Sequence, residues 1–192
     1  SRPYGAANPS FSATITGFLG SDTQGAAVSG APSFATSATA SDLPGTHANI
    51  VPSLGTLASD YNYKFQFANG TLTITKGILT ASLAGTVSRV YDGDTDATLA
   101  QGNYVLSGIV GTDVVSLNDP PSGSYDDKNV GSGKTVSVSG LALSGTNADR
   151  YILSSTTTSG DVGEITKATV TAGLTGIVAK TYDGHRLTVR AR

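Results

Sequence analysis

The segment ITKGILTASLAGTVSRVYDG, residues 74–93, returns as ITKATVTAGLTGIVAKTYDG at residues 165–184, which is 91 positions further along the chain. The two copies are identical at 11 of 20 positions, whereas unrelated segments of ordinary composition match at roughly one or two. The chain is therefore part of a tandem array of small modules. Repetition of one small unit is typical of proteins that extend and space, because such an array offers no single asymmetric catalytic site.

Alternating apolar and polar residues indicate that the repeated segment is a β-strand. Leu79, Ala81 and Leu83 are separated by hydroxyl residues, and the second copy keeps apolar residues at the same alternate positions. This period of two is typical of a strand with one buried face. The sequence therefore predicts an all-β fold of small antiparallel β-sandwich modules, Ig-like and arranged in line. The alternative for the first module is a β-grasp-like sheet with one short helix, within LGSDTQGAAV at 19–28.

The repeat divides the chain into modules joined without a flexible linker. We expect a first module at residues 1–76, a second at 77–167, and the opening strand of a truncated third module in 168–192. The ITK strand of one module is followed within a residue or two by the first strand of the next, so each joint has few rotatable bonds and the array should be stiff. Without its partner strands, the third opening strand should be disordered or should add to an exposed sheet edge. The final residues, 185–192, depart from the first copy and are assigned no function.

A second strand pattern surrounds Asn69-Gly70. The run YNYKFQFA at 61–68 and the run TLTITK at 71–76 both alternate in polarity. An Asn-Gly pair between two such runs predicts a β-hairpin with a type I′ turn, because both central residues of that turn need positive φ.

A tyrosine followed by Gly or Asp-Gly recurs along the chain. Each occurrence is typical of an aromatic anchor followed by a tight turn, in which Asp bonds local backbone and Gly supplies positive φ. We expect these residues to be structural rather than ligand-binding. They are Tyr4 with Gly5, Tyr91 with Asp92 and Gly93, and Tyr182 with Asp183 and Gly184.

The composition narrows the range of functions. The absence of cysteine excludes thiol catalysis, thiolate metal sites and disulfides. The net charge of −2 provides no basic field for nucleic acid or anionic lipid. No apolar run approaches the roughly 20 residues needed to cross a membrane. We therefore expect neither a nucleic-acid partner nor membrane insertion.

One acidic turn is a weak calcium candidate. The sequence DGDTD places Asp92, Asp94 and Asp96 at alternate positions, from which several carboxylate oxygens can reach one Ca²⁺. An EF-hand would need Gly at its sixth and Glu at its twelfth position, where this chain has Ala97 and Asn103. A solvated Asp-rich turn is therefore the favoured interpretation, and no metal or other cofactor is expected.

The sequence contains no recognisable catalytic constellation. The GKT at 133–135 ends like a phosphate-binding loop, but Lys128 stands where that loop needs its first glycine. His47 belongs to a predicted loop, and no serine lies in a nucleophile elbow. We therefore expect no enzyme activity.

Proteins without disulfides can gain mechanical strength from amide bonds between Lys and Asn or Asp. Lys76, Lys134 and Lys167 lie in strand-like segments and are the candidates for such crosslinks, provided that they are partly buried.

Longer motifs resemble known repeat families. The second module, with VYDGDTDATL at 90–99, GIVGTDVVSL at 108–117 and NADRYIL at 147–153, resembles the YDG repeat of large bacterial surface proteins. The first, with RPYGAANPSFSATITGFLGSD at 2–22 and NYKFQFANGTLTITK at 62–76, resembles the companion MBG repeat of the YGX type. Such repeats occur in filamentous-haemagglutinin-like adhesins, and the resemblance implies an extracellular location on the bacterial cell surface. The family supplies no catalytic residues.

Two functions are consistent with these features. The favoured one is a semi-rigid stalk or spacer of a surface adhesin, whose partners are the neighbouring repeats of the parent chain. The alternative is an adhesive module, for cell adhesion or biofilm formation, that binds host or biofilm glycans through exposed tyrosines and Asp/Asn loops. Sugar sites commonly stack on aromatic rings, so the absence of Trp favours the spacer.

Overall fold

The computed structural model describes residues 1–59, 63–176, 181, 182 and 184. Strands dominate this part of the chain, and the all-β prediction is confirmed. Helical structure is limited here to one turn, α1 (Gln24–Ala27), and two 3₁₀ turns, η1 (Gln101–Asn103) and η2 (Ala148–Arg150). The turn α1 lies where the sequence indicated at most a short helix. Within the described ranges, no helix is long and apolar enough to span a membrane.

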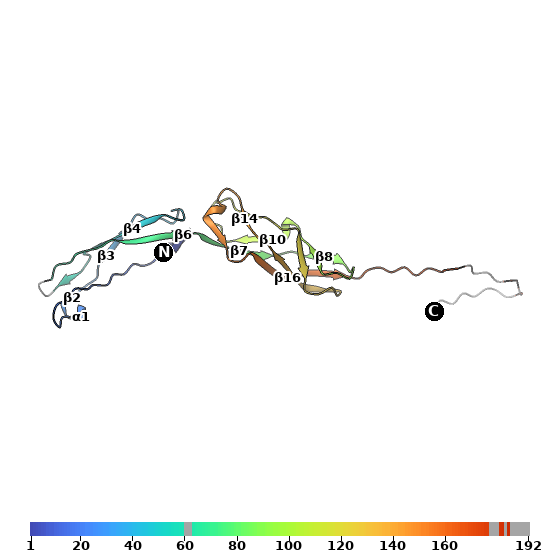
Figure 1. Ribbon diagram of the computed structural model, residues 1–192, viewed down its shortest axis with the longest axis horizontal. Helices are drawn as coiled ribbons and strands as arrows, with labels where there is room; N and C mark the ends of the chain where they lie inside the picture. The colour runs from blue at the N-terminus through green and yellow to red at the C-terminus, as the bar shows by residue number, and fades with distance from the viewer. Residues whose placement is uncertain (60–62, 177–180, 183, 185–192) are drawn as a thin grey trace.

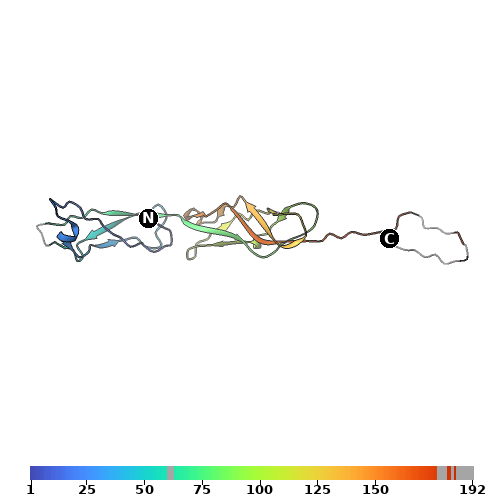
Figure 2. The ribbon, with the colours of Figure 1, turned by 90° about the horizontal axis from the view of Figure 1, so that it is seen from below.

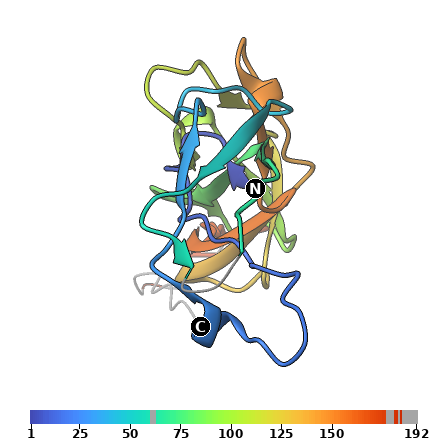
Figure 3. The same ribbon diagram turned by 90° about the vertical axis from the view of Figure 1, so that its left-hand side faces the viewer.

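Two β modules follow one another along the long axis of the molecule (Figure 1), joined where β6 (Gly70–Thr75) leads into β7 (Gly77–Leu83). The view in Figure 2 gives the same arrangement, and Figure 3 looks along this axis with the first module in front. Every strand pair in the described residues joins strands on the same side of Lys76. The in-line arrangement predicted from the repeat is therefore observed.

A four-stranded sheet forms the larger part of the first module. Besides β6, the strands of this module are β1 (Arg2–Pro3), β2 (Val28–Ser29), β3 (Ser33–Thr36), β4 (His47–Ser53) and β5 (Ala58–Ser59). The sheet has the order β1-β6-β4-β3, and β2 pairs separately with β5. The apolar residues of β6 face the core, where Leu72 and Ile74 are almost fully buried. Burial of this face fixes the position of β6 between β1 and β4.

The predicted hairpin at Asn69-Gly70 is wrong. Strand β6 begins at Gly70 and has a partner strand on each side, so neither of its edges remains for the preceding run. Residues 63–69 form no strand, and neither Asn69 nor Gly70 has the positive φ that a type I′ turn needs. Burial of β6 against distant strands outweighs the local turn preference. His47, also predicted to lie in a loop, is the first residue of β4.

The second module is a sandwich of two main sheets. Its remaining strands are β8 (Val87–Val90), β9 (Asp96–Thr98), β10 (Tyr104–Ser107), β11 (Ser116–Leu117), β12 (Ser122–Tyr125), β13 (Gly131–Ser139), β14 (Leu143–Ser144), β15 (Tyr151–Leu153) and β16 (Thr157–Thr166). One sheet has the order β8-β16-β13-β12-β9, the other has the order β10-β7-β15, and β11 pairs with β14. Buried Val87, Val136 and Ile165 of the first sheet pack with Leu83 and Leu153 of the second. The core therefore lies between the two sheets.

The sheets are mixed rather than purely antiparallel. Three of the strand pairs in the described residues are parallel: β1 with β6, β8 with β16, and β15 with β7. The alternation that predicted a strand at β7 is confirmed, because Leu79 is fully buried while Ile78 is 59% exposed.

Beyond β16, residues 168–176 form no strand, and Figure 1 shows them leaving the second module as an extended segment. This segment corresponds to β7 in the repeat, but its apolar side chains face solvent: Val170 is 92% exposed and Leu174 is 79% exposed. The predicted addition to a sheet edge is therefore not observed in this segment. Residues 177–180, Asp183 and the tail at 185–192 lie outside the described residues.

Candidate functional site at the joint between the modules

A shared hydrophobic cluster spans the joint between the modules. Lys76 alone separates β6 from β7. Buried residues from both sides form this cluster: Tyr4, Leu72 and Ile74 from the first module, and Leu79 and Tyr151 from the second. Bending at Lys76 would expose this apolar surface to water, which is unfavourable.

Tyr4 follows β1 directly and packs against the second module. Its N–H donates to the Thr75 carbonyl at 2.8 Å, which fixes its backbone beside β6. Its ring meets the Tyr151 ring edge-on, with centroids 5.6 Å apart and an interplanar angle of 82°, a favoured geometry for an aromatic pair. The Arg150 guanidinium lies 5.7 Å from the centroid of the Tyr4 ring, and its Nη1 donates to the Tyr4 hydroxyl at 3.1 Å. Two residues of the second module therefore hold Tyr4 in place.

Asp113 orients both of these residues. Its Oδ1 accepts from Arg150 Nη1 at 2.7 Å, and its Oδ2 accepts from the Tyr151 hydroxyl at 2.6 Å. The Val110 N–H in turn donates to the Tyr151 hydroxyl at 3.0 Å. Burial raises the pKa of Tyr151 to about 12, and the hydrogen bond to Asp113 acts in the same direction. The hydroxyl therefore keeps its proton at neutral pH and remains a donor to Asp113.

Two glycines allow the close packing at the joint. Gly5 has a φ of +79°, and a Cβ placed there would lie 2.3 Å from Val110 Cγ2. A Cβ on Gly77 would lie 2.8 Å from Cδ1 of the Tyr151 ring. A side chain at either position would therefore have to displace its neighbour.

The Tyr-Gly and Tyr-Asp-Gly motifs differ in their surroundings. The glycines of all three, Gly5, Gly93 and Gly184, have positive φ, at 79°, 91° and 85°. Tyr4 lies in the joint, whereas Tyr91, at the far end of the second module, is 39% exposed, and Tyr182 is also exposed. The motif that the sequence predicts to be a local turn is thus also a contact between modules at its first occurrence.

Three residues of the joint were not predicted from the sequence: Arg150 and Tyr151, which contact Tyr4, and Asp113, which binds both of them. The signal that could have indicated Asp113 is the recurrence of GFLGSD at 17–22 as GIVGTD at 108–113. Nothing comparable in the sequence indicated Arg150.

The acidic turn does not gather into a metal-binding group among the described residues. Arg89 pairs with the Asp92 carboxylate and donates to the Asp96 carbonyl. Asp92 also accepts from the Asp94 N–H at 3.1 Å, and Asp94 accepts from the Thr95 N–H at 2.5 Å. Local donors thus bind oxygens that a cation would need.

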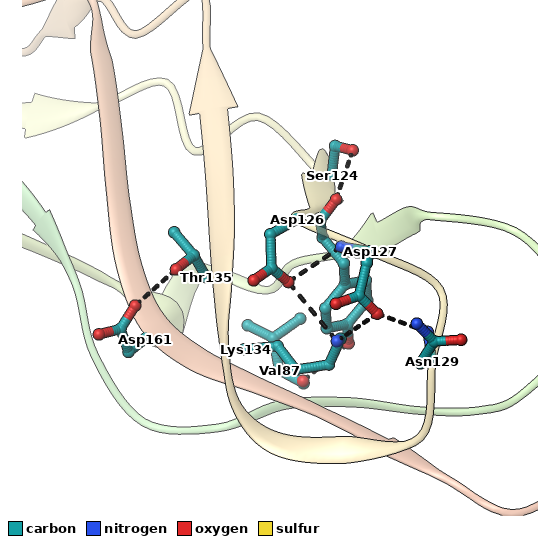
Figure 4. Close-up of polar contacts among 9 residues, drawn as sticks. Val87, Ser124, Asp126, Asp127, Asn129, Lys134, Thr135 and Asp161 are labelled. Atoms are coloured by element: carbon teal, nitrogen blue, oxygen red, sulfur yellow. Dashed lines mark hydrogen bonds and ion pairs between the residues drawn. The ribbon is translucent and has the colours of Figure 1, made fainter.

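Lys134 forms an ion pair, which opposes a covalent crosslink. In Figure 4, its Nζ lies 2.6 Å from Asp127 Oδ1 and 3.6 Å from Asp126 Oδ1. The hydrogen bond from Lys134 to Asp127 raises the pKa of Lys134 and lowers the pKa of Asp127, so both groups stay charged. Amide formation would need a neutral amine. Lys76 and Lys167 are exposed, in contrast to the burial that the crosslink hypothesis required.

Two β modules that pack end to end are typical of a repeat protein, in which each module contacts its neighbours along the chain. Residues 1–73 match the MBG domain (YGX type), and residues 75–159 match the YDG domain. The chain is thus an MBG domain of the YGX type followed by a YDG domain, in the order that the sequence resemblance predicted. Domains of these families are found in bacterial surface and repeat proteins. No curated protein and no solved structure matches the chain.

Proposed function

We propose that the chain is a semi-rigid stalk segment of a bacterial surface adhesin, which holds other parts of the parent protein away from the cell. The observation that carries this proposal is the joint, where Tyr4 contacts Tyr151 and Arg150 beside a link of one residue. The occurrence of both domain families in bacterial surface proteins supports an extracellular location. In this proposal the chain has no catalytic role, and its partners are neighbouring modules rather than nucleic acid or lipid.

The joint resists bending for two physical reasons. Rotation about Lys76 would expose the shared cluster, at about 25 cal/mol for each Å² of apolar surface returned to water. It would also break the hydrogen bond from Arg150 to the Tyr4 hydroxyl. A Gly/Ser linker in the same place would instead let the two modules move as independent bodies.

The geometry that positions Tyr4 recurs at the far end of the second module. The Tyr91 N–H donates to the Thr166 carbonyl at 2.8 Å, as the Tyr4 N–H donates to that of Thr75. In each module the tyrosine follows a strand that runs parallel to the last strand, β1 beside β6 and β8 beside β16. A further module docked after β16 would therefore meet Tyr91 as the second module meets Tyr4, and repeated joints of this kind would extend the stalk.

The second candidate function is glycan binding by an adhesive module. The observation that favours it is the exposure of Tyr91 beside the acidic turn at Asp92 and Asp94, since sugar sites combine an aromatic ring with polar acceptors. A glycan and matrix-protein array separates the two functions. A stalk segment should bind none of the ligands, whereas binding that is lost in a folded Tyr91→Ala variant would favour adhesion.

Small-angle X-ray scattering tests the stalk proposal. The chain should scatter as one elongated particle, and a short Gly-Ser insertion between Lys76 and Gly77 should broaden the distribution of its dimensions. The same insertion after the exposed Lys128 is the control and should leave the distance between the modules unchanged. Identical scattering from the wild type and the linker variant would contradict a stiff joint.

A further inference from the structure

The outer face of the five-stranded sheet in the second module is made of small polar side chains. Strand pairing across β9, β12, β13 and β16 aligns one row of exposed residues: Asp96, Ser124, Ser137 and Ser159. Two positions away on each of these strands lies a second exposed row: Thr98, Ser122, Ser139 and Thr157. These two rows together are called the hydroxyl face below.

The hydroxyl face is hollowed. A depression of about 740 Å³ lies over β12, β13 and β16, and apart from Gly123 and Val138 every residue that lines it carries a hydroxyl group. The other main sheet of this module differs, because its outer face exposes Ile78, Val105 and Ile152. A surface made almost entirely of hydroxyls is therefore a property of one sheet and not of the whole module.

Most side chains of the hydroxyl face have no hydrogen-bond partner among the described residues. Elsewhere in this module, Ser116 and Ser144 lie opposite each other on paired strands, and their hydroxyls bond to one another at 2.9 Å. Ser137 lies opposite both Ser124 and Ser159, yet within the described ranges its hydroxyl bonds to neither. The same is true of the polar side-chain atoms of five further members: Asp96, Thr98, Ser122, Ser139 and Ser159. These groups are available to a ligand.

The chemistry of the hydroxyl face selects a class of ligand. Neither row contains a basic residue, which a nucleic acid or an anionic sugar would need. Neither row contains a large apolar side chain, which the core of a protein–protein interface would need. Serine and threonine hydroxyls both donate and accept, and the Asp96 carboxylate accepts. Neutral sugars carry the matching groups, since their hydroxyls also donate and accept.

The spacing of the two rows favours an extended chain of sugars. Neighbouring strands lie about 4.8 Å apart, and residues two positions apart on one strand are separated by about 6.8 Å. In a flat β-linked glucan, each ring advances the chain by about one strand spacing, and hydroxyls lie along both edges of the ribbon. A chain that runs across the strands between the two rows can therefore place a sugar over each strand, with protein hydroxyls along both of its edges.

We propose that the hydroxyl face binds an extended, uncharged, β-linked polysaccharide that crosses β9, β12, β13 and β16. Each sugar makes only a few neutral hydrogen bonds, so the affinity depends on how many strands the chain crosses. These edge contacts take the place of the ring stacking that other sugar sites use. Tyr91 belongs to neither row, so this site differs from the adhesive site considered above, and it does not depend on the stalk role.

An NMR titration of the full isotope-labelled chain with cellohexaose tests the proposal. Amide shifts should concentrate at residues 96–98, 122–124, 137–139 and 157–159. Maltohexaose, which contains the same sugar in a coiled chain, is the control and should leave these amides unchanged. The absence of shifts at these residues with cellohexaose, or equal shifts with maltohexaose, would overturn the proposal. Shifts confined to Tyr91 and the acidic turn would also overturn it.

A pair of serine variants tests the hydroxyls themselves. Ser137→Ala combined with Ser139→Ala removes one unpaired hydroxyl from each row and should weaken the binding of cellohexaose about tenfold. Ser82→Ala combined with Ser154→Ala is the matched control, because both serines are exposed on the other main sheet, and it should bind as the wild type does. Amide spectra without ligand check that both variants fold. Equal affinities for the two variants would overturn the site, whereas the scattering that tests the stalk would be the same in either case.

Discussion

The joint depends on a tyrosine hydroxyl that keeps its proton. The pKa of Tyr151 is raised to about 12, whereas a tyrosine in an unfolded chain has a pKa of about 10. The folded chain therefore binds this proton more tightly than the unfolded chain does. The resulting stabilisation is complete below the unfolded pKa and is lost as the pH rises through the folded pKa.

Urea unfolding across this alkaline range should detect the effect. The free energy of unfolding of the wild type should fall more steeply with rising pH than that of Tyr151→Phe, because phenylalanine has no proton to lose. The comparison cancels the contributions of Tyr104 and Tyr125, whose pKa values are also raised by burial. Equal slopes for the two proteins would contradict the assignment to Tyr151.

Gly5→Ala tests the backbone contact at the joint. The added Cβ would lie 2.3 Å from Val110 Cγ2, in a backbone conformation with φ of +79°. We expect a loss of about 1–3 kcal/mol in the free energy of unfolding. Gly45→Ala is the control, because Gly45 has φ of +88° but no atom within 4 Å of its Cβ position. Equal losses in both variants would mean that the contact with Val110 contributes nothing.

Among the strands, β7 carries the pattern that predicted the fold, and its two faces should respond differently to truncation. Leu79 is fully buried and the adjacent Ile78 is largely exposed. Leu79→Ala should lower the free energy of unfolding by about 2–5 kcal/mol, and Ile78→Ala should change it by about 0.5 kcal/mol or less. Chemical denaturation measures both, and similar losses would contradict a one-sided strand.

Gly70→Ala distinguishes strand β6 from the hairpin turn that the sequence predicted. Gly70 lies outside the positive-φ region, and its Cβ would make ordinary contact with Ile50 at 3.6 Å. We expect a change of about 0.5 kcal/mol or less in the free energy of unfolding. A loss of about 1 kcal/mol or more would instead indicate a left-handed turn residue.

These elements show what the sequence can and cannot predict. The buried face of β7 follows from its own alternation, which is local information. The partners of β6 do not follow from local information. Strand β4 begins more than twenty residues earlier, at His47, and competes with the run at 61–68 for the same edge of β6. The outcome depends on which pairing buries more apolar surface, and a local turn signal does not measure that.

For the two modules taken together, the repeat predicted their order and their in-line arrangement. It did not predict the contacts that hold them, because Tyr4 and Arg150 are separated by 146 positions. The short link indicated a stiff joint, but the aromatic pair and its aspartate are visible only in three dimensions.

Pulsed electron paramagnetic resonance tests most directly whether the modules move as one body. The chain has no cysteine, so spin labels can be attached to Ser37→Cys in the first module and Gln101→Cys in the second, both exposed. We expect one narrow distance distribution for this labelled chain and a broad one when Tyr4→Ala is added. A broad distribution in the labelled chain that retains Tyr4 would contradict the stiff joint.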